Sequence, residues 1–152
     1  MAEDAAATSA ELSTVRAHRI RLREASQELE AALAAPLTGR LDGWVRQVRP
    51  AVQRIRDAFA AHVSFTEGRG GLFDQIRTDA PRLVTALARL HREHGEITAG
   101  LAAAEEQLEA RGEAGMARVR EQLTAALTAL SLHRKRGADL LYEAYQVDLG
   151  GE

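Results

Sequence analysis

Residues 57–73, which read DAFAAHVSFTEGRGGLF, join the end of a helical pattern to a histidine, a carboxylate and a glycine-rich stop. The apolar residues before His62 recur every three or four positions, which is the spacing of one face of an α-helix. They are Leu41, Val45, Val48, Val52, Ile55 and Phe59. His62 takes the next place on this row, so we expect its imidazole to face the protein interior. Glu67 and three glycines follow, and they predict that the helix ends there.

The same spacing recurs in three other long segments of the chain. We expect helices at about residues 9–35, 39–67, 79–110 and 113–147, with a short helical turn at 72–76. Four long amphipathic helices with short connections predict an all-α, up-down-up-down four-helix bundle. The predicted organisation is a flexible N-terminal tail at 1–9, the bundle at 10–147, and a C-terminal tail at 148–152.

Local signals refine the expected helix boundaries. Ser9 is the expected cap of the first helix, and Thr78 or Asp79 is the expected cap of the third, with Pro81 in its first turn. Pro50 lies inside the second helix, where the missing N–H predicts a kink or a break.

Each of the four long patterns carries a histidine on its apolar row: His18, His62, His94 and His133. Consecutive helices in such a bundle are antiparallel, so the depth of each histidine can be counted from one shared end. At 1.5 Å per residue the four lie roughly 26–31 Å from that end, a spread of about one helical turn. We therefore expect the four imidazoles to meet at one level in the interior.

A single buried histidine is usually a core residue with one hydrogen bond. Four that face one another need metal, water or carboxylates as partners, because imidazole nitrogens are not left unpaired when buried. Neutral imidazole is the commonest metal ligand, so we interpret the four as candidate metal ligands. Phe59, Phe65 and Phe73 predict apolar packing near His62, either as plain core or as a lining that limits water.

Two glycines inside the helices also call for a reason, since glycine in a helix interior costs about 1 kcal/mol relative to alanine. Gly95 follows His91 by four residues, and Gly137 follows His133 by four. Close helix approach and room for a ligand beside the imidazoles are the two interpretations.

The composition excludes several classes of function. The chain of 152 residues has no cysteine, which rules out disulfides and thiolate metal sites and fits a cytoplasmic protein. Its net charge of −2 gives no general attraction to nucleic acid or to an anionic membrane. No apolar run approaches the roughly 20 residues that span a bilayer. Phosphate-binding loop, zinc-protease and nucleophile-elbow motifs are all absent from the sequence.

From about residue 12 to residue 145 the chain resembles the haemerythrin-like (HHE cation-binding) domain family. The matching features are His18, the run HVSFTE at 62–67 followed by Leu72 and Phe73, the segment REH at 92–94, and His133. The resemblance implies a four-helix bundle that holds two non-haem irons bridged by oxygen and carboxylates. It also implies binding or sensing of dioxygen, or handling of iron, nitric oxide or peroxide.

The spacing of the candidate ligands departs from the family pattern. A glutamate four residues after the second histidine is replaced by Thr66, with Glu67 one position later. His91 and His94 are three apart rather than four, and the acid after His133 is delayed to Asp139. On a regular helix a step of five turns about 140° and a step of six about 240°, so these acids leave the histidine face.

Alternatives therefore remain open for these residues. Glu67 is either a solvated helix end or turned inward where the glycines unwind the chain, and Asp139 is either a ligand or part of a solvated face. His91 is a second ligand, a donor to another ligand, or a flank residue. The candidate metal ligands are His18, His62, His94 and His133, then His91 and Glu67, and finally Asp139.

Three functions are consistent with these residues. The first is a non-haem iron protein, with zinc as the alternative metal, that binds or senses dioxygen or another small oxidant. The second is a metal-free interaction or regulatory module that acts through a protein partner or as a homo-oligomer. The third is an enzyme that uses the same cluster for oxidative chemistry on an organic substrate.

Overall fold

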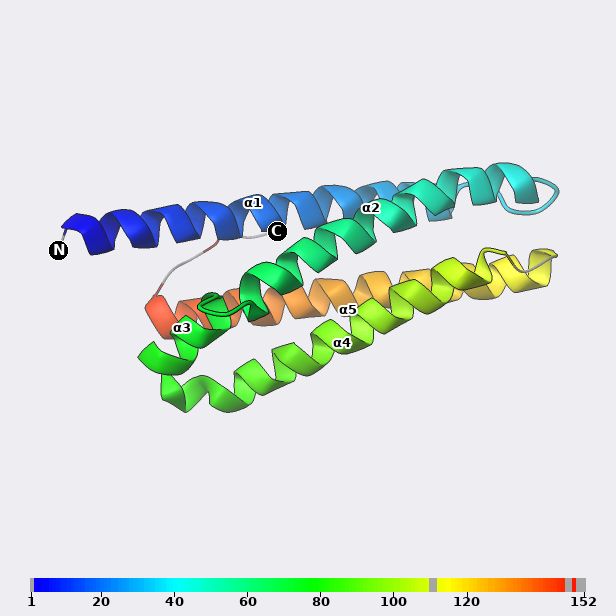
Figure 1. Ribbon diagram of the computed structural model, residues 1–152. Coiled ribbons are helices and arrows are strands. Elements are labelled where there is room, and N and C mark those ends of the chain that lie inside the picture. The colour runs from blue at the N-terminus through cyan, green and yellow to red at the C-terminus, as the bar shows by residue number, and fades with distance from the viewer. Residues whose placement is uncertain (1, 110–111, 147–148, 150–152) are drawn as a thin grey trace.

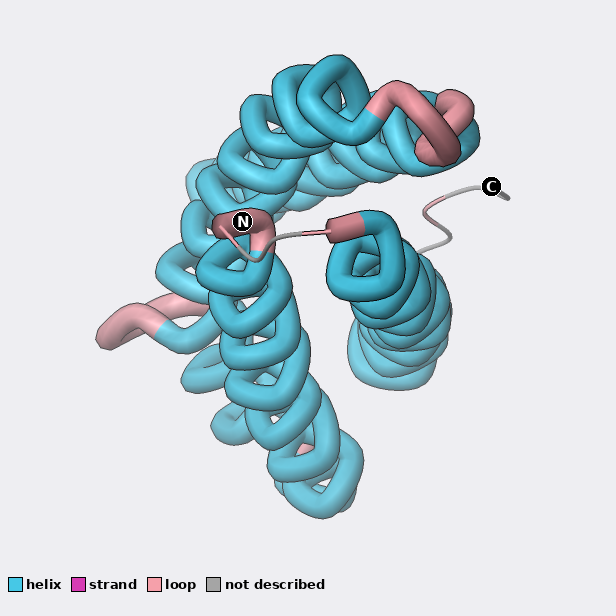
Figure 2. The backbone as a smooth tube through the Cα atoms, turned by 90° about the vertical axis from the view of Figure 1, so that its right-hand side faces the viewer, coloured by secondary structure: helices cyan, strands magenta, loops and turns pink. Residues whose placement is uncertain are grey.

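The computed structural model describes residues 2–109, 112–146 and 149. Within this part of the chain every regular element is helical (Figures 1 and 2). The four long helices are α1 (Ala2–Ala34), α2 (Leu41–Glu67), α4 (Val84–Gln107) and α5 (Glu113–Tyr145). Helices α1 and α4 each pack on both α2 and α5, and consecutive long helices run in opposite directions. The predicted all-α four-helix bundle is therefore confirmed.

The connection between α2 and α4 contains more helix than the sequence predicts. A short helix, α3 (Leu72–Asp79), is followed by the 3-10 turn η1 (Pro81–Leu83). Thr78 and Asp79 lie inside α3, so the predicted cap at these residues is wrong. Ala80, at φ −136° and ψ 63°, separates the two elements, because the residue before a proline is disfavoured in the α region. α4 then begins at Val84.

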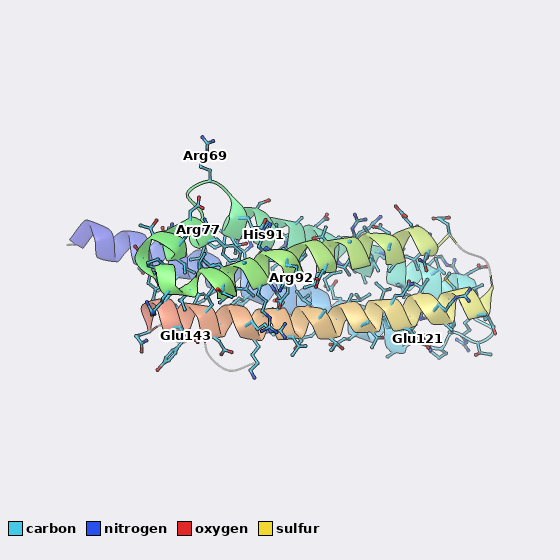
Figure 3. All side chains as sticks on the ribbon, turned by 90° about the horizontal axis from the view of Figure 1, so that it is seen from below. Arg69, Arg77, His91, Arg92, Glu121 and Glu143 are labelled. Carbon is cyan, nitrogen blue, oxygen red and sulfur yellow. The ribbon has the colours of Figure 1, made fainter. Side chains whose placement is uncertain are left out.

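The predicted start of the first helix is also wrong, and of the two alternatives predicted at Pro50, a kink or a break, the break does not occur. α1 begins at Ala2, so Ser9 lies inside the helix rather than at its cap, and the first turns of α1 extend past the end of the bundle (Figures 1 and 3). α2 continues through Pro50 without a break. Val48, Ala51 and Val52 are all buried around this proline, so the packing of the flanking turns outweighs the one backbone hydrogen bond that proline removes.

The glycine-rich stop after α2 is required by the backbone. The N–H of Gly71 donates to the carbonyl oxygen of Gly68 at 2.7 Å, and Gly70 has φ +71°, where a side chain is strained. A Cβ at Gly71 would also lie 2.7 Å from the carbonyl oxygen of Phe65. This turn ends α2 at Glu67, as predicted, and redirects the chain into α3.

The core is divided into two apolar clusters along the bundle. The larger apolar cluster contains Leu29, Trp44, Val48, Phe59 and Leu123 among its buried members. The smaller apolar cluster is built around α3 and contains Val15, Phe73, Ile76, Leu90 and Leu140. On α2, α4 and α5 the histidine (His62, His94 or His133) lies between residues of the larger cluster and residues that belong to or pack against the smaller one, so a polar layer separates the two clusters.

The C-terminal end of α5 is Tyr145, followed by Gln146 in the left-handed region at φ 57°. The predicted helix end at 147 lies outside the described residues, and so does the predicted tail at 148–152 apart from Leu149, which packs against the smaller apolar cluster. None of the described helices has the length and apolar character that crossing a membrane requires.

Candidate metal centre

Three histidines from three helices converge between the two apolar clusters. His62 comes from α2, His94 from α4 and His133 from α5. The Nε2 atom of His62 lies 3.2 Å from Nε2 of His94 and 3.3 Å from Nε2 of His133. His94 and His133 are buried, and His62 is partly buried. We call these three side chains the histidine layer.

The helical rows explain why these rings meet. His94 follows Leu87 and Leu90 and precedes Ile97 on the buried face of α4. His133 likewise follows Leu130 on α5, and both of these residues are buried. Because each histidine continues a row that packs in the core, its ring is directed inward by the same packing that forms the bundle.

Two carboxylates hold the other nitrogen of two of these rings. Oε1 of Glu67 lies 2.6 Å from Nδ1 of His94, and Oε2 of Glu93 lies 2.9 Å from Nδ1 of His133. A carboxylate accepts, so each Nδ1 carries the proton and each Nε2 keeps its lone pair free. This arrangement orients an imidazole for metal binding and makes its free nitrogen more basic.

Glu93 is a site residue that the sequence reasoning did not identify. Its side chain is buried, its Oε1 accepts from Arg136 at 2.5 Å, and Arg89 lies 3.5 Å from the same oxygen. Arginine and His133 therefore bind opposite oxygens of one carboxylate. An acid one position before His94 and four after Arg89 looks like a member of a solvated ion pair, which is why the pattern did not single it out.

Burial controls the charge of the histidine layer. It lowers the pKa of His62 to about 2, with further lowering from the neighbouring His94 and His133. Burial also lowers the pKa of His94 and of His133, although the hydrogen bonds to Glu67 and Glu93 act in the opposite direction. All three imidazoles are therefore neutral at neutral pH, which is the form that binds a metal ion.

Phenylalanine rings surround the histidine layer, as the sequence predicts. Phe73 stacks on His94 with ring centroids 5.4 Å apart and planes at 4°. Phe59 stacks on His62 at 5.7 Å and meets His94 and His133 edge-on. These apolar rings limit the access of water to the three imidazoles.

His18 lies beside the histidine layer but does not converge with it. Its ring stacks on Phe65 with centroids 5.0 Å apart, and it is not among the residues whose ligand atoms lie within 4.8 Å of one another, namely His62, His94 and His133. His18 lines a cavity of about 50 Å³ together with His62 and His133. The structure thus brings three of the four predicted histidines together and places the fourth at the cavity wall.

The remaining candidate ligands lie further out. Oε1 of Glu67 lies 2.7 Å from Nδ1 of His91, whose side chain is 72% exposed beside α2 (Figure 3). Glu67 is thus turned toward α4 rather than toward His62. Asp139 is exposed on α5.

The two glycines of the helix interiors differ in their surroundings. A Cβ added at Gly95 or at Gly137 would meet no heavy atom within 4 Å, so close helix approach explains neither. Gly137 lines the same cavity as His18, His62 and His133, whereas Gly95 is exposed. Only Gly137 therefore leaves space beside the imidazoles.

The donor set of the histidine layer fits a metal ion. Metal–nitrogen bonds of about 2.0–2.1 Å at near-tetrahedral angles separate two ligand nitrogens by about 3.3–3.4 Å, and the Nε2 atoms lie 3.2 Å and 3.3 Å apart. Without an ion, His62 Nε2–H can donate to only one of the two facing nitrogens. The arrangement leaves a lone pair unpaired unless a cation or an additional donor occupies the centre.

Comparison with known proteins is consistent with this chemistry. A family model described as hemerythrin HHE cation-binding domain matches residues 11–145. No curated protein and no solved structure matches the chain significantly.

Proposed function

Because the chain belongs to the hemerythrin HHE cation-binding domain family, we propose that it is a non-haem metal protein that binds or senses dioxygen or a related small oxidant. The observation that carries this proposal is the convergence of three neutral imidazoles, with Nε2 atoms 3.2 Å and 3.3 Å apart. Iron is the metal we propose, since the family resemblance implies it. Zinc is the alternative, because imidazole ligands suit both.

The size of the adjacent cavity supports a ligand of only a few atoms. A water molecule needs about 10–15 Å³ of such space, and the cavity beside His62 and His133 measures about 50 Å³. Pockets that hold drug-sized ligands measure about 300–1,000 Å³, so this cavity is small for an organic substrate. We therefore favour binding or sensing of a small oxidant over oxidation of an organic compound.

Each residue of the site has a role in this proposal. A bound iron ion would supply the redox-active centre to which the small oxidant binds. His62, His94 and His133 would hold the ion through Nε2, while Glu67 and Glu93 keep the protons on Nδ1 of His94 and His133 and fix these two rings. Phe59 and Phe73 exclude water from the imidazoles.

The test is metal analysis of protein purified without a histidine tag, followed by absorption spectra before and after exposure to dioxygen. We expect retained iron and a spectral change on exposure. His62→Ala should abolish metal binding and leave the helix content, measured by circular dichroism, largely intact. His91→Ala is the matched control, because this exposed ring is not part of the histidine layer and Glu67 keeps its contact with Nδ1 of His94 when His91 is removed, so the metal content should be unchanged.

Two results of the metal analysis would contradict parts of this proposal. Wild-type protein that takes up neither iron nor zinc would contradict the proposal and favour a metal-free interaction module. Unchanged metal content in His62→Ala would remove His62 from the site.

A further inference from the structure

We infer that the histidine layer binds a single metal ion through three imidazoles, rather than a carboxylate-bridged pair, and that His18 faces the small ligand instead of binding metal. This inference rests on the proposed function and specifies its centre. It differs from the two bridged irons that the resemblance implies, and it depends on where the carboxylates of this chain are placed.

Both nearby carboxylates are already used on the outer side of the imidazoles. Glu93 binds Nδ1 of His133 with one oxygen and Arg136 with the other. Oε1 of Glu67 binds Nδ1 of His94 and of His91. The Nδ1 and Nε2 atoms lie on different edges of an imidazole, so these carboxylates support the rings and do not reach the space between the Nε2 atoms. Among the described residues, the group that converges on that space contains no carboxylate.

The positions that could supply an inward carboxylate hold other residues. Thr66, four residues after His62, is buried, and its hydroxyl donates to the backbone carbonyl oxygens of His62 and Val63. Gly137 and Ala138, four and five residues after His133, carry no metal-binding group, and Asp139 is exposed. Two ions in contact would require a bridging oxygen ligand, and the inner faces of α2 and α5 do not provide one from a carboxylate.

His18 is placed as a ligand-facing residue. Its ring is stacked on Phe65 and lines the cavity that also reaches His62, His133 and Gly137. An ion held by three nitrogens keeps at least one open position, as in sites where three protein ligands leave room for a small molecule. The cavity is where that molecule would enter, and the His18 imidazole, together with Arg19 and Arg134, is one of the few polar groups in its largely apolar wall.

The experiment is a count of metal per chain combined with electron paramagnetic resonance. Untagged protein is loaded anaerobically with Fe(II), freed of unbound metal, measured by elemental analysis, and then oxidised. We expect one iron per chain and the signal of an isolated high-spin ferric ion. His18→Ala should keep one iron per chain with altered kinetics of nitric oxide binding to the Fe(II) form. His62→Ala, which removes a proposed ligand, should keep none and so measures adventitious binding.

The outcomes separate this inference from the proposed function. Two irons per chain, or a retained iron content that is silent after oxidation because two ferric ions are coupled, would overturn the single-ion centre while leaving metal binding intact. Loss of iron in His18→Ala would overturn the role given to His18. Absence of iron from the wild-type protein would overturn the proposed function itself.

Discussion

The larger apolar cluster and the histidine layer are built by the same helices, but the histidine layer, unlike most of the apolar cluster, buries polar groups that need hydrogen-bond partners. Leu29, Val48 and Leu123 are fully buried and need no polar partner. The rings of His94 and His133 are also buried, yet each brings nitrogens that require partners, and Glu67 and Glu93 satisfy only the outer ones. The comparison indicates that the larger apolar cluster contributes most of the stability and the histidine layer provides the binding site. Mutations in one region should therefore change stability without changing metal binding, or the reverse.

The largest expected effect on stability comes from the apolar cluster. Trp44 is 1% exposed, and Trp44→Ala should lower the free energy of unfolding by about 3–5 kcal/mol, because it leaves a large cavity. Metal bound per folded chain should stay at the wild-type value, since this side chain is not part of the histidine layer. Urea denaturation and elemental analysis of the same preparations provide the two measurements.

Trp44→Phe is the matched control for this substitution. Among the described residues the buried indole Nε1 has no hydrogen-bond partner, so replacing it with an apolar ring removes no hydrogen bond. Trp44→Phe should therefore lower the free energy of unfolding much less than Trp44→Ala does. Loss of metal from folded Trp44→Ala protein would show that the two regions are not separable.

The second prediction concerns acid and the metal-free protein. The pKa of His62 is about 2 in the folded protein and about 6.5 when unfolded, and the pKa values of His94 and His133 are also lowered. As the pH falls below about 6.5, the unfolded chain therefore binds more protons than the folded protein does. The free energy of unfolding must then decrease as the pH decreases. Between about pH 6.5 and 5.5 each histidine that stays neutral contributes about 1 kcal/mol to this loss.

Urea denaturation of metal-free protein at several pH values measures this loss. His62→Ala should reduce the dependence on pH, whereas Trp44→Phe, which removes no titrating group, should keep it. An unfolding free energy that does not change between about pH 6.5 and 5.5 would contradict neutral burial of the three rings.

The apolar rows could be predicted from the sequence because periodicity reports which residues share a helix face. The row of Leu87, Leu90, His94 and Ile97 is buried throughout, and the inward direction of His94 follows from it. Trp44 was missed, because the predicted row passed through Leu41 and Val45, which pack only at the edge of the larger cluster. Periodicity thus gives the face of a helix with an error of about one residue.

The partners of the imidazoles could not be predicted, because they depend on contacts between helices. Glu93 directly precedes His94 and so does not lie on the apolar row that contains His94. Only the position of α5 shows that Glu93 contacts His133 and Arg136. His18 lies on the predicted row of α1, but its ring takes Phe65 as a partner and stays at the cavity wall. Counting residues along the helices predicted that the rings lie at one level, but it could not show which side chains contact each ring.

The third prediction tests whether Glu93 acts through His133. Glu93→Gln leaves one acceptor oxygen where two donors, Arg136 and His133, now compete, and it removes the charge that holds the Nδ1 proton. We expect metal affinity to fall about 10- to 100-fold, as is typical when a carboxylate behind a metal-binding histidine is lost. Competition with a chelator measures the affinity, and a merely structural role would leave it unchanged at equal stability.

Glu96→Gln is the control for this substitution. Glu96 lies on the same helix, is exposed, and is one turn beyond the residues that support the histidine layer. It should bind metal with wild-type affinity. Equal losses in both variants would assign the effect to the charge of α4 and not to the contact with His133.

The smallest expected effect distinguishes the two helix glycines. Gly137→Ala and Gly95→Ala should each stabilise the protein by about 0.5–1 kcal/mol, because both glycines lie within helices and an added Cβ meets no heavy atom within 4 Å. Only Gly137 lines the cavity, so only Gly137→Ala should slow the reaction of the Fe(II) protein with dioxygen in stopped-flow absorption. If both variants gain stability and react at the wild-type rate, the cavity is not the route to the ion. If Gly137→Ala alone is slowed, a more stable helix is accompanied by poorer ligand access, which would explain why glycine stands at this position.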